Sequence, residues 1–154
     1  TNAETGKVAS TLTEFYKFVG SPDSLAKVKE AGKDYESNRT DAELRKMVTD
    51  FPEGFKYFDT SSSKSISDAY NQLVARTTQS NRTGSTVTVT VPVEAVIAKD
   101  GKATIDSTKL KVESKGKTSV GTEAPYFENP QMSLIQKTDG SWVLIPEPPR
   151  HTIP

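Results

Sequence analysis

The side chains that could do chemistry in this chain are carboxylates and hydroxyls. The 154 residues include no Cys and one His, His151, which lies among prolines near the end of the sequence. A cysteine nucleophile, a thiolate metal site and a multi-histidine metal site are therefore excluded. The sequence also lacks an Asp-x-Asp-x-Asp-Gly calcium loop, a Gly-rich phosphate loop and a nucleophile elbow. We predict no catalytic residue set, no metal site and no cofactor.

A carboxylate acting as general base is the one catalytic route that remains. Asp34, Asp59 and Asp106 are the carboxylates nearest to expected elements. Such a base needs burial that raises its pKa, and all three lie in hydrophilic contexts. We interpret them as cap or turn residues. Ser61 and Lys64 have the Ser-x-x-Lys spacing of acylases, but nothing else of that machinery is present, and we interpret the segment as a capped turn.

Three aromatic residues are the candidate ligand-binding residues. Tyr57, Tyr70 and Trp142 each combine an apolar ring with a polar group that needs a hydrogen-bond partner, so each could line a cavity between helices and sheet. The alternative is that they are ordinary core residues, which is the more common fate of aromatics on amphipathic stripes.

Composition narrows the class of partner. Lys plus Arg and Asp plus Glu number 20 each, so no basic field is present to bind nucleic acid or an anionic membrane. The hydrophobic fraction is 33%, and no apolar run is long enough to span a bilayer. The small polar residues 1–6 resemble the start of a mature exported protein. The Thr- and Ser-rich, Cys-free composition also favours export. We expect a secreted or surface-anchored domain.

The elements that must position these residues follow from periodicity. Apolar residues recur at helical spacing in 8–19, 25–28, 44–48 and 66–74, and Thr40 with Glu43 forms a capping box before the third of these segments. In 83–98, valines at every second position alternate with threonines, which predicts one long strand with four valines on one face. We expect the helical stripe led by Ile66, Tyr70 and Leu73 to pack on that face.

Strands and turns dominate the second half of the chain. Asp100-Gly101 and Asp139-Gly140 are hairpin signals, a bulge is expected between Asp106 and Lys109, and a short aromatic strand is expected over 54–58. The prediction is an α+β fold, with N-terminal helices on one face of a curved, cone-like antiparallel sheet of about four to five strands. We expect a single domain over 1–154, with 1–6 and 147–154 as extended or disordered tails.

This order of elements resembles the nuclear transport factor 2-like, or cystatin-like, fold. The resemblance rests on the helix over 8–19, on the helix over 66–74 that leads into the strand over 83–98, and on the closing strand that Gly140-Ser141-Trp142 begins. The sequence also resembles small actinobacterial secreted low-molecular-weight antigens and lipoproteins of unassigned function. Enzymes of this superfamily place Asp, His or Tyr at the cone mouth, so the resemblance implies that a catalytic site would lie there. This sequence departs from that pattern because it has no His in its expected core.

Two function hypotheses follow. The first is a non-catalytic exported or surface-anchored domain that binds a protein partner or a small apolar ligand in the cone between sheet and helices. The second is a proton-transfer enzyme of the isomerase or dehydratase kind that uses a pocket carboxylate. We expect no nucleic-acid partner, a monomer or weak homodimer, and contact with a membrane only through a lipid anchor outside this sequence.

Overall fold

The chain has an α+β architecture, as predicted. A computed structural model describes residues 2–33, 39–82, 86–115 and 132–146. In these residues the helices come first and the strands follow: α1 (Asn2–Gly20), α2 (Ser24–Gly32), α3 (Asp41–Asp50), α4 (Pro52–Phe55), α5 (Ser63–Arg82), β1 (Thr86–Thr90), β2 (Val96–Lys99), β3 (Lys102–Ile105), β4 (Lys111–Lys115), β5 (Ser133–Gln136) and β6 (Trp142–Leu144). The strands form two antiparallel sheets, one of order β1-β4 and one of order β2-β3-β5-β6.

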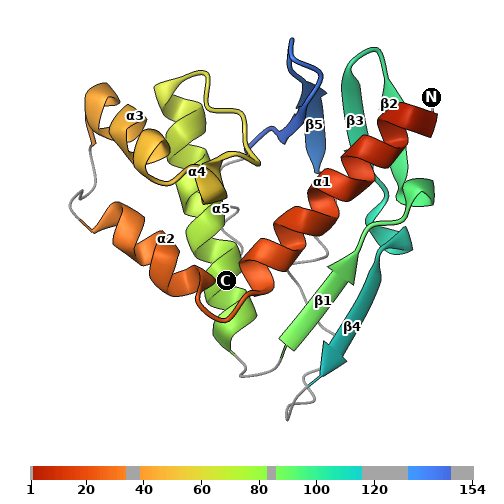
Figure 1. Cartoon of the computed structure of the whole chain (residues 1–154), viewed down its shortest axis with the longest axis horizontal. Coiled ribbons are helices and arrows are strands. Elements are labelled where there is room, and N and C mark those ends of the chain that lie inside the picture. The colour runs from red at the N-terminus through yellow and green to blue at the C-terminus, as the bar shows by residue number, and fades with distance from the viewer. Residues whose placement is uncertain (1, 34–38, 83–85, 116–131, 147–154) are drawn as a thin grey trace, which may run out of the picture.

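Helix α1 is the central element of the structure. It runs diagonally between the other helices and the two sheets (Figure 1), and it packs against α2, α5, β1, β2 and β6. Its apolar stripe of Val8, Leu12, Phe15 and Val19 is buried, which confirms the predicted amphipathic helix. The helix begins at Asn2, so the expectation of a tail over 1–6 is wrong for residues 2–6. The expected tail at 147–154 lies outside the described residues.

Helix α5 is placed differently from the prediction. Its Ile66, Ala69 and Leu73 are buried as expected. However, α5 packs chiefly against α1, α2 and α3, and among the strands it reaches mainly β1. The prediction that this stripe supports the valine face was therefore wrong, because α1 lies between α5 and most of the sheet surface (Figure 1).

The predicted long strand over 83–98 is interrupted. β1 and β2 are separated by a 3-10 turn at Val93–Ala95, in which the Ala95 amide donates to the Pro92 carbonyl at 3.0 Å. Pro92 has no N–H to continue a strand ladder, and its fixed φ suits the start of the turn. Val89 and Val91 are buried, but Val93 is 50% exposed. The prediction of four valines on one face was wrong at Val93.

A second 3-10 turn lies opposite the first. It spans Ser107–Lys109, where a bulge was predicted, and the Asp106 amide donates to the Ala95 carbonyl at 2.8 Å. The segment β1–β2 and the segment β3–β4 are therefore interrupted next to each other, and this divides the strands into two sheets. Val112 lies opposite Val89 in the register but is 44% exposed, because α1 packs over β1 and not over the outer strand β4.

Both predicted hairpins are present. Asp100 and Gly101 have φ values of 54° and 76°, the left-handed pair that a two-residue turn between β2 and β3 requires. Gly140 has φ 90° in the turn between β5 and β6. The predicted aromatic strand over 54–58 was wrong, because α4 covers Pro52–Phe55 and only Phe58 makes a strand bridge, to Leu144.

Candidate functional site

A surface hollow of about 620 Å³ lies between the first turns of α1 and the β5–β6 hairpin. Its volume is within the range of roughly 300–1,000 Å³ that is typical of small-molecule sites. One wall comes from α1, and a second wall comes from the hairpin turn and Trp142 of β6. The lining residues are Ala3, Gly6, Lys7, Ser10, Thr11, Asp139, Gly140, Ser141 and Trp142.

The α1 wall is a face of small and polar residues. Counted from the first member, the others stand three, four, seven and eight residues further on, so the helix geometry places them on one face. They are Ala3, Gly6, Lys7, Ser10 and Thr11. A Cβ atom added at Gly6 would meet nothing within 4 Å, so the space beside this wall is open.

The hairpin wall is held in shape by its own hydrogen bonds. The Ser141 amide and the Ser141 hydroxyl both donate to Asp139 Oδ1, at 2.9 and 2.6 Å. These bonds hold the pKa of the Asp139 carboxyl below its usual value, and the nearby Lys137 adds to the effect. Asp139 is therefore a fixed negative charge at neutral pH and is poorly suited to act as a general base.

Trp142 has a buried polar group with no partner among the described residues. The side chain is 3% exposed, and its Nε1–H finds no acceptor in that part of the chain. Its strand position is fixed by pairing with Gln136 of β5. An unsatisfied buried donor costs about 1–3 kcal/mol, so an acceptor from outside the described residues would stabilise the folded chain.

The hollow carries one cation and one anion that do not pair with each other. Lys7 of α1 is exposed and makes no ion pair with any residue in the described parts of the chain. Asp139 of the hairpin lines the same hollow, and its hydrogen bonds lie within its own turn. Ser10 and Thr11 of α1 add hydroxyl groups to the lining.

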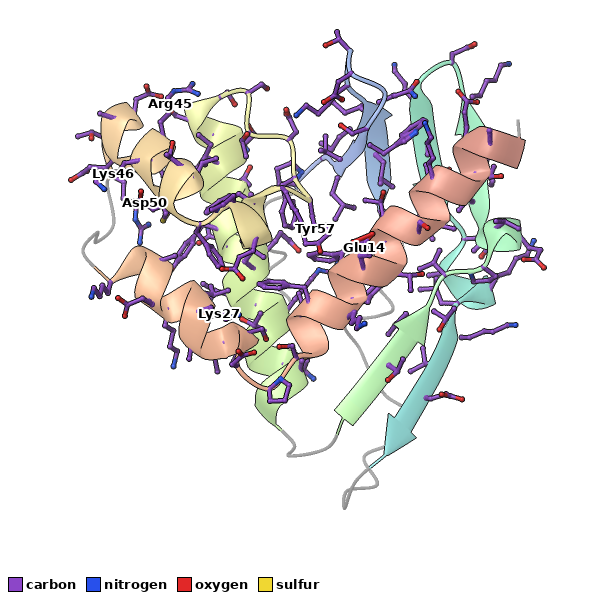
Figure 2. All side chains as sticks on the ribbon, viewed as in Figure 1. Glu14, Lys27, Arg45, Lys46, Asp50 and Tyr57 are labelled. Atoms are coloured by element: carbon purple, nitrogen blue, oxygen red, sulfur yellow. The ribbon has the colours of Figure 1, made fainter. Side chains whose placement is uncertain are left out.

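The other two predicted ligand-binding residues lie elsewhere. Tyr57 is 7% exposed and packs edge-on against Phe15 at 5.4 Å. Burial raises the pKa of its phenol, and the negative charge of Glu14 raises it further; Figure 2 shows Glu14 beside Tyr57. Tyr70 of α5 is half-buried against α2, and its hydroxyl reaches the Val28 carbonyl at 3.5 Å. Of the three, only Trp142 lines the hollow.

The predicted carboxylates that the structure describes are turn residues. Asp59 accepts from the Ser61 amide and hydroxyl, and Asp106 accepts in the same way from Thr108. These bonds lower the pKa of Asp106. Asp34 lies outside the described residues. Among the residues that are described, no carboxylate is buried and no cluster of three potential metal ligands occurs.

The charged side chains of α3 are also solvated. Lys46 pairs with Asp50 at 2.6 Å and Arg45 pairs with Asp41 at 3.1 Å, and all four side chains are more than half exposed. Figure 2 shows Arg45, Lys46 and Asp50 on this helix. Exposed pairs of this kind contribute little and build no pocket.

A buried arginine is the other unusual polar group. Arg76 of α5 is 9% exposed, lies over the rings of Phe15 and Tyr16 at 5.7 and 5.9 Å, and donates from Nε to Gln72 at 3.3 Å. Burial raises the pKa of Tyr16, and Arg76 offsets part of that rise. We therefore interpret Arg76 as a core cation held by aromatic faces.

Sequence reasoning missed most of the hollow. The spacing of Ala3, Gly6 and Ser10 was the signal available, because small residues three and four apart leave one helix face open. Ala3 and Gly6 lie in residues 1–6, which were expected to be a tail, and Ser10 lies in the predicted helix but outside its apolar stripe.

Comparisons with known proteins add nothing to this picture: a scan against protein-family models, a search of curated proteins and a search of solved structures each returned no match. Among the described helices, none is both long and apolar enough to cross a bilayer.

Proposed function

We propose that this chain is a non-catalytic binding domain that holds a small polar ligand in the hollow between α1 and the β5–β6 hairpin. The observation that carries the proposal is the buried indole N–H of Trp142, which has no acceptor within residues 2–33, 39–82, 86–115 and 132–146 and belongs to a residue lining that hollow. A ligand atom that accepts this hydrogen bond would remove the cost of leaving the donor unsatisfied.

The lining supports a polar ligand over the apolar one expected from the sequence. Apart from Trp142, its side chains are hydroxyls, one ammonium, one carboxylate and a small methyl group. Small-molecule sites use a few convergent polar groups of this kind to fix the orientation of the ligand. A fatty acid or sterol would leave these groups without water and without partners.

The described carboxylates support a non-catalytic role. Where a pKa shift is resolved, as for Asp23, Asp41, Asp106 and Asp139, the shift is downward. A carboxylate base that works near neutral pH needs the opposite shift. Export or surface anchoring, and the likeness to the nuclear transport factor 2-like fold, remain predictions from the sequence.

The single tryptophan makes the proposal directly testable. Because Trp142 is the only tryptophan in the chain and lines the hollow, its emission should report on any ligand that enters. We would titrate the protein with α-amino acids, monosaccharides, dicarboxylic acids and a medium-chain fatty acid, and follow both emission and thermal unfolding. We expect a saturable response to at least one polar compound and none to the fatty acid.

A blocked hollow provides the decisive variant. Gly6→Leu should fill the open space beside α1 without a backbone clash, and leucine favours the helix more than glycine does. Lys17→Leu is the matched control, because Lys17 is exposed on the same helix and outside the hollow. Binding should be lost in Gly6→Leu and kept in Lys17→Leu. A response to none of the polar compounds, or equal binding by both variants, would overturn the proposed function.

A further inference from the structure

We propose that the ligand of this hollow is a small zwitterion of the α-amino-acid type, with its carboxylate bound by Lys7 and its ammonium bound by Asp139. This inference rests on the proposed function and adds the chemical class of the ligand. It starts from the two charged side chains among the lining residues, one from α1 and one from the β5–β6 hairpin.

The two charges are available to a ligand. Lys7 is exposed and has no ion-pair partner among the described residues, and it does not pair with Asp139. Both hydrogen bonds from Ser141 go to Oδ1 of Asp139. The second carboxylate oxygen, Oδ2, is therefore left to accept from a ligand ammonium.

Two opposite charges that line one hollow select against ligands with a single charge. A monoanion that pairs with Lys7 would share the hollow with the Asp139 carboxylate, which its hydrogen bonds keep ionised. A monocation that pairs with Asp139 would meet Lys7 in the same way. A zwitterion satisfies both groups at once, and complementary charge of this kind gives specificity more than raw affinity.

The neutral donors complete the match. The indole N–H of Trp142 needs an acceptor, and the hydroxyls of Ser10 and Thr11 lie on the same wall as Lys7. A carboxylate has two oxygens and can accept from several donors at once. An amino acid whose side chain ends in a carbonyl offers Trp142 an acceptor of its own.

A matched set of compounds tests the charge requirement. We would titrate L-glutamine and L-leucine against glutaramic acid and 4-methylvaleric acid, which lack the ammonium, and against 4-aminobutanamide and isoamylamine, which lack the carboxylate. Trp142 emission and isothermal titration calorimetry would give the dissociation constants. We expect the dissociation constant of each amino acid to be at least about tenfold lower than that of either singly charged analogue, since a hydrogen bond to a charged group is worth about 1.5–3 kcal/mol.

Variants connect the requirement to the two walls. Lys7→Met and Asp139→Asn should each weaken amino-acid binding by about tenfold or more and reduce the preference over the analogue that lacks the matching charge. Lys17→Met on α1 and Asp100→Asn in the β2–β3 turn are the controls and should bind as the unmodified protein does. The exchanged pair Lys7→Glu with Asp139→Lys should recover part of the preference for zwitterions.

The outcomes separate this inference from the proposed function. In two cases the zwitterion inference is wrong: singly charged analogues bind as well as amino acids, or only a monosaccharide binds. If Gly6→Leu abolishes the observed binding in either case, the proposed binding hollow still stands. If none of the polar compounds changes Trp142 emission or the unfolding temperature, both fail.

Discussion

The contact between α2 and α5 permits a sharp test of the packing, at Gly32. This glycine ends α2 and faces the ring of Tyr70. A Cβ at this position would lie 2.1 Å from the Tyr70 hydroxyl oxygen and 2.5 Å from Cζ. Both distances are far inside van der Waals contact, so Gly32→Ala forces the tyrosine ring to move. The ring also carries Arg39 at 4.9 Å over its face, a contact that its displacement would disturb.

The expected cost follows from two opposing terms. Overpacking of a filled site costs about 1–3 kcal/mol. Alanine favours a helix over glycine by up to about 1 kcal/mol, less at a helix end, and this offsets part of the cost. We expect Gly32→Ala to lower the free energy of unfolding by about 1–2 kcal/mol. For a chain of this length that corresponds to a fall of about 2–4 °C in Tm per kcal/mol.

A double-mutant cycle assigns the effect to the ring. In a Tyr70→Ala background, Gly32→Ala should be neutral or slightly stabilising, because the atoms it would meet are gone. Gly6→Ala is the matched control, since its new Cβ meets nothing within 4 Å and should stabilise α1 by about 0.5–1 kcal/mol. Urea unfolding followed by Trp142 emission and circular dichroism gives all the values. If Gly32→Ala is as stable as the unmodified protein, or costs as much without the ring as with it, the described contact between α2 and α5 is wrong.

Three further predictions concern caps, core and pH. Thr40→Ala should lower the free energy of unfolding by about 0.5–2 kcal/mol, because it removes the acceptor for the Glu43 amide. Thr49→Ala on the exposed face of α3 is the control and should not lower it. Equal effects of the two variants in denaturant melts would count against the cap. Leu12→Ala should cost about 2–5 kcal/mol, since this side chain of α1 is fully buried in the core. A loss below about 1 kcal/mol in the same melts would contradict its burial. The folded pKa of Asp106 is lowered, so its stabilising effect is full above the unfolded pKa and is lost as pH falls through the folded pKa. Asp106→Asn should therefore be less stable than the unmodified protein at neutral pH, with a difference that shrinks in acid; a difference that does not change with pH would refute the assignment.

The features that the sequence predicted correctly depend on neighbouring residues. The capping box of α3 involves two residues three apart, and the Asp100-Gly101 turn depends on the left-handed backbone of its own two residues. The buried stripe of α1 follows from helix geometry alone. Each of these signals is complete within a few residues, so no knowledge of the rest of the chain is needed.

The predictions that failed depend on which element covers which. The alternation of valine and threonine continues through Pro92, but the hydrogen-bonded ladder does not, because proline has no N–H to donate. The alternation also could not show that α1, more than α5, would lie against the strands. Val93 is exposed because it lies in the 3-10 turn, and Val112 is exposed because α1 packs over β1 and not over β4.

The candidate site was also predicted only in part, because its residues come together through tertiary packing. Trp142 was predicted as a ligand-binding residue and does line the hollow, whereas Tyr57 belongs to the aromatic core around Phe15. Sequence alone cannot separate these cases, because an aromatic residue in a pocket wall and one in the core have the same local pattern. The α1 wall was missed since its members are small or polar and carry no hydrophobic period.

Helix α1 links the proposed site to the stability of the whole molecule. Val8, Leu12 and Phe15 on one face belong to the buried core, while Gly6 and Lys7 on another face line the hollow. A ligand that binds only the folded chain adds about 2.7 kcal/mol to the free energy of unfolding at a concentration of 100 times its dissociation constant. That gain is comparable to what the loss of one core leucine removes. Because one rigid helix carries both faces, a ligand in the hollow would stabilise the same element that supports both sheets, so binding and folding of this chain should be measured together.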